Sequence, residues 1–370
     1  MSRRFTVSFV IFAAMFAGCS SPEIDISSSE STLQNLTPAQ LAGQRIIYGY
    51  PGLVPPPELF DRIRAGEAAG VHFSSLNIES RDQIRAVVAE LVGAQQESPI
   101  PLPLLLITDQ EGGAVRALGG EPLVTAKQIG LSPNAEALAV RAGADAAEAL
   151  RDVGMNVNLA PVLDVFREPG GLIDQLERSY SNDPNVVRRL GAAFVRGHRS
   201  DGGVAAGAKH FPGLGALRAD QTPDFEPVTL DISRNTLRNV DERPYVGAIA
   251  AGVELVMTSW VVYTGLDDAR PAGLSPLVLR QELRGRLGFR GVTISDVLIA
   301  GALDPFGGHG ERAVLAAGAG EDLLLCAFSP FAECDNARDG LATALQNGEL
   351  DKVDSAIATL RILALRAKLN

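Results

Sequence analysis

Ionisable side chains follow the ends of several short apolar runs in this sequence. In the clearest case, a run of small residues ends in Lys209 and His210. Asp109, Asp164 and Asp296 each come directly after a similar run. Carboxylates can accept hydrogen bonds from hydroxyl groups, attack carbon or transfer a proton, and cations can donate hydrogen bonds. This set therefore predicts acid–base or nucleophilic chemistry, provided that the fold brings the ends of the runs together.

The apolar runs alternate with segments of helical pattern. The runs cover residues 45–50, 70–73, 104–108, 157–163, 204–208, 255–258, 291–295 and 322–327. Helical segments lie at residues 135–153, 184–200, 277–287 and 311–317, and two more follow the last run at about 336–346 and 352–368. Repeated strand–helix alternation with continuously apolar strands predicts an α/β fold, a single (β/α)8 TIM barrel with C-terminal helices. The C-terminal ends of barrel strands share one face, so the ionisable residues should meet there.

Several other kinds of chemistry lack their usual residues. The histidines are scattered, without a pair at the spacing of a metalloprotease motif. The glycine pairs at 112–113 and 170–171 match neither a phosphate loop nor a dinucleotide fingerprint, and no serine nucleophile elbow is present. We therefore expect no metal and no other cofactor. Carboxylates and cations around a barrel mouth would instead suit a neutral, polyhydroxylated substrate such as a glycoside.

Composition restricts the partners. The formal net charge of -11 argues against nucleic acid, because phosphate binding depends on Lys and Arg contacts. More than 300 of the 370 residues follow the N-terminal segment. This length suits one barrel domain better than two small domains with separate cores. We expect a monomer.

The N-terminus predicts export. Arg3 and Arg4 precede an apolar stretch at residues 5–17, and Gly18 and Cys19 follow it. This pattern is typical of a bacterial lipoprotein signal at residues 1–18, with Cys19 lipidated; the alternatives are an ordinary secretory signal that contains a cysteine and a twin-arginine export signal. Residues 19–36 are polar and read as a flexible tether, and residues 37–370 form the barrel domain. The predicted location is extracytoplasmic, with the Cys19 lipid as the only membrane anchor.

Two cysteines remain, Cys326 and Cys334. Outside the cytoplasm they could form a disulfide around a small loop, or stay as thiols in separate packing environments. The spacing alone does not decide between the two.

Six motifs occur in order: "ITDQEGGAVRAL" (107–118), "NVNLAPVLDV" (156–165), "ERSYSNDP" (177–184), "KHFPG" (209–213), "ELVMTSW" (254–260) and "LGFRGVTISDVL" (287–298). Together the motifs resemble the bacterial β-N-acetylglucosaminidases (β-N-acetylhexosaminidases) of glycoside hydrolase family 3, over residues 40 to 330. The resemblance implies the N-terminal-type barrel domain of that family and a retaining mechanism. It also implies a β-linked amino-sugar glycoside as substrate, such as a muropeptide from peptidoglycan.

The resemblance assigns roles to five residues. Asp296 in "ISDVL" matches the family's nucleophile, which must stay ionised against the anomeric carbon. Asp109 matches the carboxylate that accepts hydrogen bonds from sugar hydroxyls. Lys209, His210 and Arg178 match residues that contact the sugar. The two cations after the small-residue run would then bind sugar and take no part in proton transfer; a structural ion pair is the alternative.

The sequence also departs from the family. The loop after "KHFPG" typically contains the acid/base histidine, but Thr222 stands at that position and Leu214 replaces an earlier histidine. Threonine cannot deliver a proton near neutral pH as an imidazole does. Two family arginines are absent from 114–117, where Arg116 is offset by one position. Trp260 stands where a histidine is common, and would either stack on a sugar or fill space.

Two function classes therefore remain open. In a working hydrolase the replacement acid/base would be Asp220, our candidate catalytic partner of Asp296, or Asp224 on the same loop. In a pseudoenzyme, the same tethered barrel would bind cell-wall sugars or a protein partner, with catalysis impaired. A glucosidase or other hexosidase is also open, because no residue that recognises the 2-acetamido group is identifiable.

Overall fold

The structure is a computed structural model that describes residues 35–369. The predicted signal peptide, Cys19 and residues 19–34 of the predicted tether lie outside the described residues. Among the described helices, none is both long and apolar enough to cross a bilayer.

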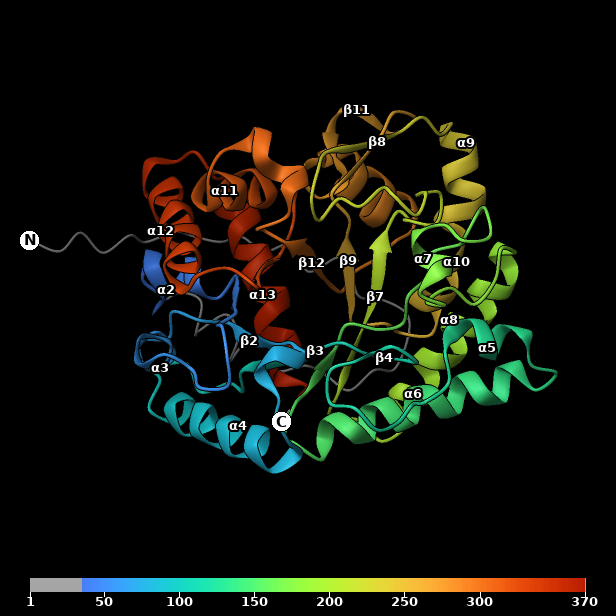
Figure 1. Cartoon of the computed structure of the whole chain (residues 1–370). Coiled ribbons are helices and arrows are strands. Elements are labelled where there is room, and N and C mark those ends of the chain that lie inside the picture. Colours follow the sequence, from blue (N-terminus) through green and yellow to red (C-terminus); the bar gives the residue numbers. More distant parts are fainter. Residues whose placement is uncertain (1–34, 370) are drawn as a thin grey trace, which may run out of the picture.

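Eight parallel strands close into a barrel in which neighbours in the chain are neighbours in space, and the last strand pairs with the first (Figure 1). The strands are β1 (Ile46–Tyr48), β2 (Gly70–Phe73), β3 (Leu105–Thr108), β6 (Val157–Asn158), β7 (Ala205–Phe211), β9 (Leu255–Thr258), β12 (Val292–Val297) and β13 (Leu323–Cys326). Each lies in or overlaps one of the eight predicted runs. The predicted (β/α)8 barrel is confirmed.

Several strands differ in length from the prediction, and two of the differences, in β6 and β7, concern the barrel mouth. β6 ends at Asn158, and the next residue in a bridge is Val162, opposite Lys209. Between them, Ala160 and Pro161 still accept hydrogen bonds from Gly207 and Lys209, but Pro161 has no N–H to donate to the ladder. β7 runs to Phe211, three residues beyond the predicted end at 208. Lys209 and His210 are therefore strand residues and do not follow the strand.

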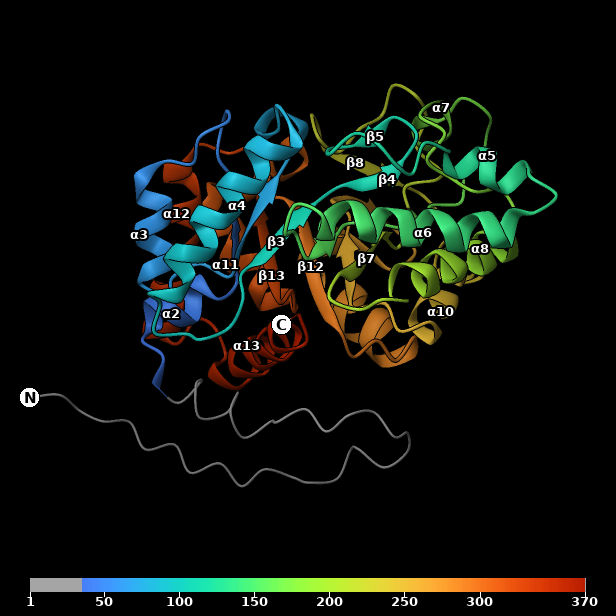
Figure 2. The same ribbon diagram turned by 90° about the horizontal axis from the view of Figure 1, so that it is seen from below.

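Helices surround the barrel on all sides except the mouth, as Figures 1 and 2 show. They are α2 (Pro38–Gly43), α3 (Pro57–Arg64), α4 (Arg81–Gln96), α5 (Ala126–Leu131), α6 (Ala135–Arg151), α7 (Leu172–Gln175), α8 (Pro184–His198), α9 (Arg234–Thr236), α10 (Arg243–Ala250), α11 (His309–Ala319), α12 (Phe331–Asn347) and α13 (Lys352–Ala367), with the 3₁₀ or π segments η1 (Ser75–Asn77), η2 (Leu237–Asp241), η3 (Ala272–Leu274), η4 (Leu277–Arg286) and η5 (Gly301–Phe306). The predicted helix at 277–287 is the π-helical segment η4.

Small sheets extend the mouth of the barrel. β4 (Gln110–Gly112) and β5 (Val115–Arg116) form a hairpin after β3. β8 (Val228–Leu230), β10 (Val261–Tyr263) and β11 (Asp267–Pro271) form a sheet beyond the tips of β7 and β9 (Figure 1). Both sheets belong to connections that leave the C-terminal ends of barrel strands, where this fold builds its sites.

The opposite end of the barrel is closed by α13, which lies beside β12 and β13 in Figure 2. Its Ile362 and Leu365 join the buried apolar cluster that the inward-facing strand residues form. Arg366 on the same helix is buried and donates to the carbonyl oxygens of Pro103 and Leu102 at 2.7 Å each. The barrel interior is thus a packed core that leaves only the C-terminal face open.

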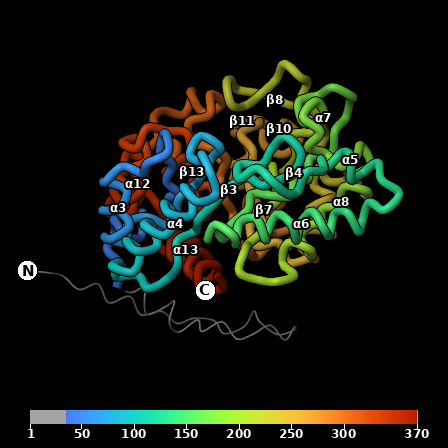
Figure 3. Tube along the Cα trace, turned by 60° about the horizontal axis from the view of Figure 1, so that its bottom comes forward, coloured from blue at the N-terminus to red at the C-terminus, as the bar shows by residue number. Residues whose placement is uncertain are grey.

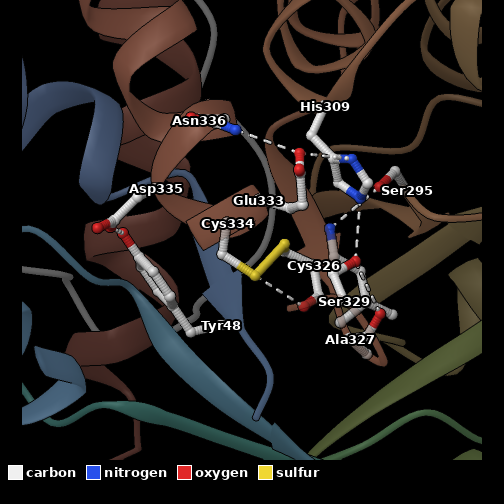
Figure 4. The surroundings of a disulfide bond; sticks show 11 residues. Tyr48, Ser295, His309, Cys326, Ala327, Ser329, Glu333, Cys334, Asp335 and Asn336 are labelled. Atoms are coloured by element: carbon white, nitrogen blue, oxygen red, sulfur yellow. Dashed lines mark hydrogen bonds and ion pairs between the residues drawn. A yellow bond between two sulfur atoms is a disulfide. The ribbon is translucent and has the colours of Figure 1, made fainter. Parts of the chain in front are cut away.

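A disulfide joins Cys326, the last residue of β13, to Cys334 in the first turn of α12 (Figure 4). Of the two arrangements that the sequence left open, the structure has the disulfide. The bond closes the loop between this strand and this helix, at the rim of the barrel mouth.

Helices α6 and α8 run side by side, as the tube in Figure 3 shows, and glycines allow their backbones to approach closely. A Cβ atom built on Gly143 of α6 would lie 2.1 Å from the carbonyl oxygen of Phe194 on α8. On α4, by contrast, a Cβ on Gly93 would meet nothing within 4 Å. The two helical glycines thus differ in what a methyl group would contact.

We expect Gly143→Ala to destabilise the protein by about 1–3 kcal/mol, because the two helix backbones must move apart. Gly93→Ala, the matched control, should stabilise it by up to about 1 kcal/mol through helix propensity. Chemical unfolding of the two variants beside the parent measures both effects. Equal stability of the two variants would contradict this account of the α6–α8 contact.

Candidate active site

A cavity of about 580 Å³ opens at the C-terminal ends of the barrel strands, within the size range of small-molecule sites. Its lining includes the ionisable residues His72, Asp109, Glu111, Arg116, Arg178, Lys209, His210, Asp224 and Asp296. Five of the six predicted catalytic or sugar-binding residues are in this set, and Asp220 is not. The barrel therefore gathers residues that are up to 224 positions apart in the sequence, from His72 to Asp296.

A chain of opposite charges crosses one side of the cavity. Lys209 is only 3% exposed, and its Nζ donates to Asp109 and lies 2.7 Å from Oε1 of Glu111. Arg178 donates to both carboxylate oxygens of Glu111, at 2.8 and 2.9 Å. Each of these four buried charged groups has a partner of opposite sign, as a low-dielectric site requires.

These contacts set the protonation states. Burial opposes ionisation of Asp109, but Lys209 and His72 outweigh it and hold the pKa far below the ordinary value. Burial likewise disfavours the Glu111 carboxylate, yet Arg178 and Lys209 lower its pKa to about 2. Burial disfavours the Lys209 ammonium too, and the two carboxylates raise its pKa. The network is fully charged near neutral pH.

Two histidines are each oriented by a carboxylate. His72 Nε2 lies 2.9 Å from Oδ2 of Asp109, and His210 Nδ1 lies 2.8 Å from Oδ2 of the fully buried Asp164. Asp164 also accepts hydrogen bonds from the backbone N–H groups of His210 and Leu214, at 3.3 and 2.7 Å. Since Nδ1 of His210 is occupied by Asp164, its Nε2 is the nitrogen available to a ligand.

Irregular pairing near the ends of β7 and β12 sets the directions of the Lys209, His210 and Asp296 side chains. Between Ala208 and Phe211 the pairing of β7 with β9 shifts register, with one extra residue on β7. The pairing of β12 with β13 shifts in the same way between Ile294 and Val297. Successive side chains on a regular strand face opposite sides, whereas such shifts re-aim them. Lys209 and His210 can therefore both line the cavity, and so can Asp296.

Asp296 lies near the end of β12 at the wall of the cavity. Its Oδ1 accepts a hydrogen bond from the N–H of Val297 at 2.7 Å. Burial raises the pKa of Asp296 and the charge of Asp224 adds to this, while His210 acts in the opposite direction. Behind the strand, Trp260 is 1% exposed and donates from Nε1 to the carbonyl oxygen of Val297 at 2.9 Å. Trp260 thus fills space and supports the strand end, and it does not face the cavity.

Only part of the loop after β7 lies at the cavity. Leu214 and Leu217 are buried in the core. Asp220 lies outside the cavity, with a side chain 75% exposed and an ion pair to Arg218 at 3.2 Å. Asp224 lines the cavity. The structure therefore brings the second of the two candidate acid/base residues, and not the first, toward Asp296.

Backbone contacts dock this part of the loop onto η5. The N–H of Gly301 donates to the carbonyl oxygen of Asp224 at 2.8 Å, and the N–H of Ala302 donates to that of Pro223 at 3.0 Å. A Cβ on Gly301 would lie 2.2 Å from the carbonyl oxygen of Phe225, so the approach needs a glycine. The segment that carries Asp224 is thereby tied to the connection that follows Asp296.

Arg116, offset by one position from a family arginine, lines the cavity. Its guanidinium donates to the carbonyl oxygens of Gly113 and Gly120 and so braces the loop around the β4–β5 hairpin. Within residues 35–369, no group of three or more His, Cys, Asp or Glu side chains is arranged to hold a metal ion.

Comparison with known proteins agrees with this architecture. Residues 57–365 match the Glycosyl hydrolase family 3 N terminal domain. The chain belongs to glycoside hydrolase family 3. It is a glycosidase, a hydrolase of O-glycosyl bonds, and the family assignment from the six motifs is confirmed.

Individual relatives span most of the chain. An uncharacterized secreted glycosyl hydrolase of Arthroderma benhamiae is 39% identical over 366 residues, which are 98% of this chain and 100% of that protein. A Beta-hexosaminidase of Tolumonas auensis is 34% identical over 303 residues, 80% of this chain and 85% of its own. The structure of a family 3 beta-N-acetylglucosaminidase from Paenibacillus sp. superposes with a TM-score of 0.83 at 33% identity, over 90% of this chain and 63% of that one.

Two residues of this family 3 site were not predicted. Glu111 lies two positions after Asp109 in the "DQEGG" motif, and its place on the hairpin strand β4 turns it toward Lys209. His72 was counted only among scattered histidines, although it stands in β2 one position before the strand ends. Glu111 could have been identified as a carboxylate two positions from Asp109, a predicted sugar-binding residue. His72 could have been identified as a histidine near the end of a barrel strand.

We expect Glu111→Gln to lower stability by about 3 kcal/mol at pH 7, because Lys209 and Arg178 would lose a buried counter-charge. The pKa of Glu111 is lowered from 4.5 to about 2, so its ionisation stabilises the fold above pH 4.5. That stabilisation is lost as the pH falls through this range. Denaturant unfolding from pH 7 to pH 2 measures the difference between variant and parent, which should shrink below pH 4.5.

The exposed Glu136, paired with Arg196 at 2.9 Å, offers the control. Glu136→Gln should change stability little at any pH, because surface pairs are well solvated. A difference for Glu111→Gln that stayed constant from pH 7 to pH 2 would contradict the assigned charge state.

Proposed function

We propose that this family 3 glycosidase hydrolyses β-linked N-acetylglucosaminides with retention of configuration and that Asp296 is its nucleophile. The observation that carries the proposal is the position of Asp296, which lines the same cavity as the proposed sugar-binding wall of Asp109, Lys209 and His210. In that wall, Asp109 offers acceptors to sugar hydroxyls, while Lys209 and His210 offer donors. Arg178 holds Glu111 and thereby the wall itself.

The proposed reaction has two steps. In the first, a carboxylate oxygen of Asp296 attacks the anomeric carbon, the glycosidic C–O bond breaks, and the leaving oxygen takes a proton from the acid/base. In the second, water attacks the anomeric carbon, gives a proton to the acid/base, and releases Asp296. Two inversions leave the product in the β configuration. The hydrogen bond from the N–H of Val297 favours the ionised Asp296 that the first step needs.

We assign the acid/base role to Asp224. Thr222 takes the place of the usual histidine and is not among the cavity-lining residues. Its Oγ1 instead accepts a hydrogen bond from the N–H of Asp224 at 3.3 Å and so shapes the turn that presents Asp224. Asp220, the candidate that the sequence predicts, does not line the cavity: its side chain is exposed and pairs with Arg218.

The names of relatives support the sugar. Proteins called Beta-hexosaminidase and beta-N-acetylglucosaminidase share the barrel at more than 30% identity, so we infer an amino-sugar glycoside, derived from peptidoglycan, as substrate. One relative is called secreted, and disulfides such as Cys326–Cys334 persist outside reducing compartments. We therefore propose an extracytoplasmic monomer, held to the membrane by the lipid on Cys19.

A sugar-binding pseudoenzyme is the second candidate. The replacement of the acid/base histidine by Thr222 favours it, together with the burial of Leu214 where a polar residue is usual. The complete set of charged wall residues would then serve binding alone.

We expect Asp296→Ala to lower kcat on 4-nitrophenyl N-acetyl-β-glucosaminide by about 10⁴-fold or more, since no other group can form the covalent intermediate. Added azide should partly restore nitrophenol release and yield the α-glycosyl azide. For the parent, proton NMR of the first product should show the β-anomer. An α-anomer would contradict the retaining mechanism. Saturable sugar binding by a parent without turnover would favour the pseudoenzyme.

We expect Asp224→Asn to lower kcat by about 10²–10⁴-fold on substrates with poor leaving groups, because these need a proton from the acid/base. A 2,4-dinitrophenyl substrate should be affected far less, and azide should accelerate its turnover with the β-glycosyl azide as product. Asp220→Asn, four positions away on the same loop, is the matched control and should stay within about twofold of the parent. The reverse pattern would assign the role to Asp220.

A further inference from the structure

The connection between β13 and α12 carries a bulky side chain in an unusual backbone conformation. Phe328 has φ 59°, in the left-handed region that normally favours glycine. Its side chain is 56% exposed and lines the active-site cavity. Burial of the ring therefore gives the fold little in return for the strained backbone. Such outliers are retained where the surrounding structure holds them, and they gather at functional sites.

Three contacts hold this connection (Figure 4). The Cys326–Cys334 disulfide joins its two ends across a separation of eight residues. The residue after Phe328, Ser329, is buried, and its Oγ lies 3.0 Å from Nε2 of His309 on α11. Nδ1 of His309 in turn lies 3.3 Å from Glu333 in the first turn of α12. The position of Phe328 is thus fixed from both sides.

The ring of Phe328 lies next to the sugar-binding wall. It meets the ring of His72 edge to face, with centroids 5.8 Å apart at an interplanar angle of 62°. His72 contacts Asp109 at 2.9 Å, and all three residues line the cavity. An exposed aromatic surface thus lies one side chain away from the carboxylate that would bind sugar hydroxyls.

We propose that Phe328 is a substrate-binding residue, an aromatic wall on which the C–H face of the bound pyranose packs, and that the disulfide loop holds it in place. A pyranose has polar edges and apolar faces, so it pairs with a site that offers charged groups at the edge and a ring at the face. Asp109 and Lys209 supply the first, and Phe328 supplies the second. The inference rests on the proposed function, since it requires a sugar in this cavity.

Phe328→Gly separates binding from folding. Removal of the ring should raise KM for 4-nitrophenyl N-acetyl-β-glucosaminide about tenfold, and the inhibition constant of N-acetylglucosamine by a similar factor, while kcat stays within about threefold. The melting temperature should stay level or rise, because glycine suits a positive φ. A residue with a purely structural role would lower the melting temperature and leave the inhibition constant unchanged.

The double variant Cys326→Ser/Cys334→Ser tests the loop. It should raise KM and the inhibition constant about threefold, because the ring of Phe328 is less well placed. A reductant should raise both constants to the same extent in the parent and should not change them in the double variant. Leu131→Ala, which removes a side chain 79% exposed on α5 outside the cavity lining, is the control and should change neither constant.

Each outcome has one reading. Unchanged constants for Phe328→Gly in an active parent would overturn the aromatic wall and leave the proposed function intact. Unchanged constants for the cysteine variant alone would overturn the role of the disulfide. A parent that neither hydrolyses the glycoside nor binds N-acetylglucosamine would overturn the proposed function, and this inference with it.

Discussion

The site depends on one buried cation and its two carboxylates. Lys209, on β7, lies between Asp109 and Glu111, which follow β3, two strands away around the barrel. A buried ammonium without counter-charges would be very costly, and two adjacent carboxylates without a cation would repel each other. The three residues are therefore stable in this place only together. The ion pairs of Lys209 with Asp109 and Glu111 hold the segment after β3 at a fixed distance from β7, and so help to set the width of the cavity.

Two further parts of the mouth are attached to this frame. Arg178 pairs with Glu111 on one side, and the ring of His72 links Asp109 to Phe328 on the other. The segment with Asp224 is tied by backbone hydrogen bonds to η5, which follows Asp296. The cavity lining thus combines a network of ion pairs with two carboxylates, Asp224 and Asp296, that stand outside this network. This division is what a glycosidase needs, because binding and bond cleavage make different demands on charge.

The sequence predicts the barrel and most of the residues at its mouth, but not how each side chain is aimed. Strand positions follow from continuous apolar runs, since strands buried on both faces must be apolar. The register shifts at Lys209 and Asp296 leave no such pattern, because they depend on pairing with β9 and β13. The choice between Asp220 and Asp224 depends on hydrogen bonds from Gly301 and Ala302, which lie about 80 positions further along the chain. Hydrophobic patterns carry no information about such contacts.

The proposed acid/base, Asp224, is a carboxylic acid and not the histidine that is usual in the family, so substrate binding would have to favour its protonated form. Burial raises the pKa of Asp296, whereas Asp224 is exposed on its loop. The proposed mechanism needs Asp296 ionised and Asp224 protonated. A sugar that enters the cavity would cover Asp224 and remove its water, which favours the neutral acid, while His210 and the N–H of Val297 continue to favour the ionised Asp296. Substrate binding would then itself prepare the acid, so the docked position of the Asp224 segment is a condition for catalysis.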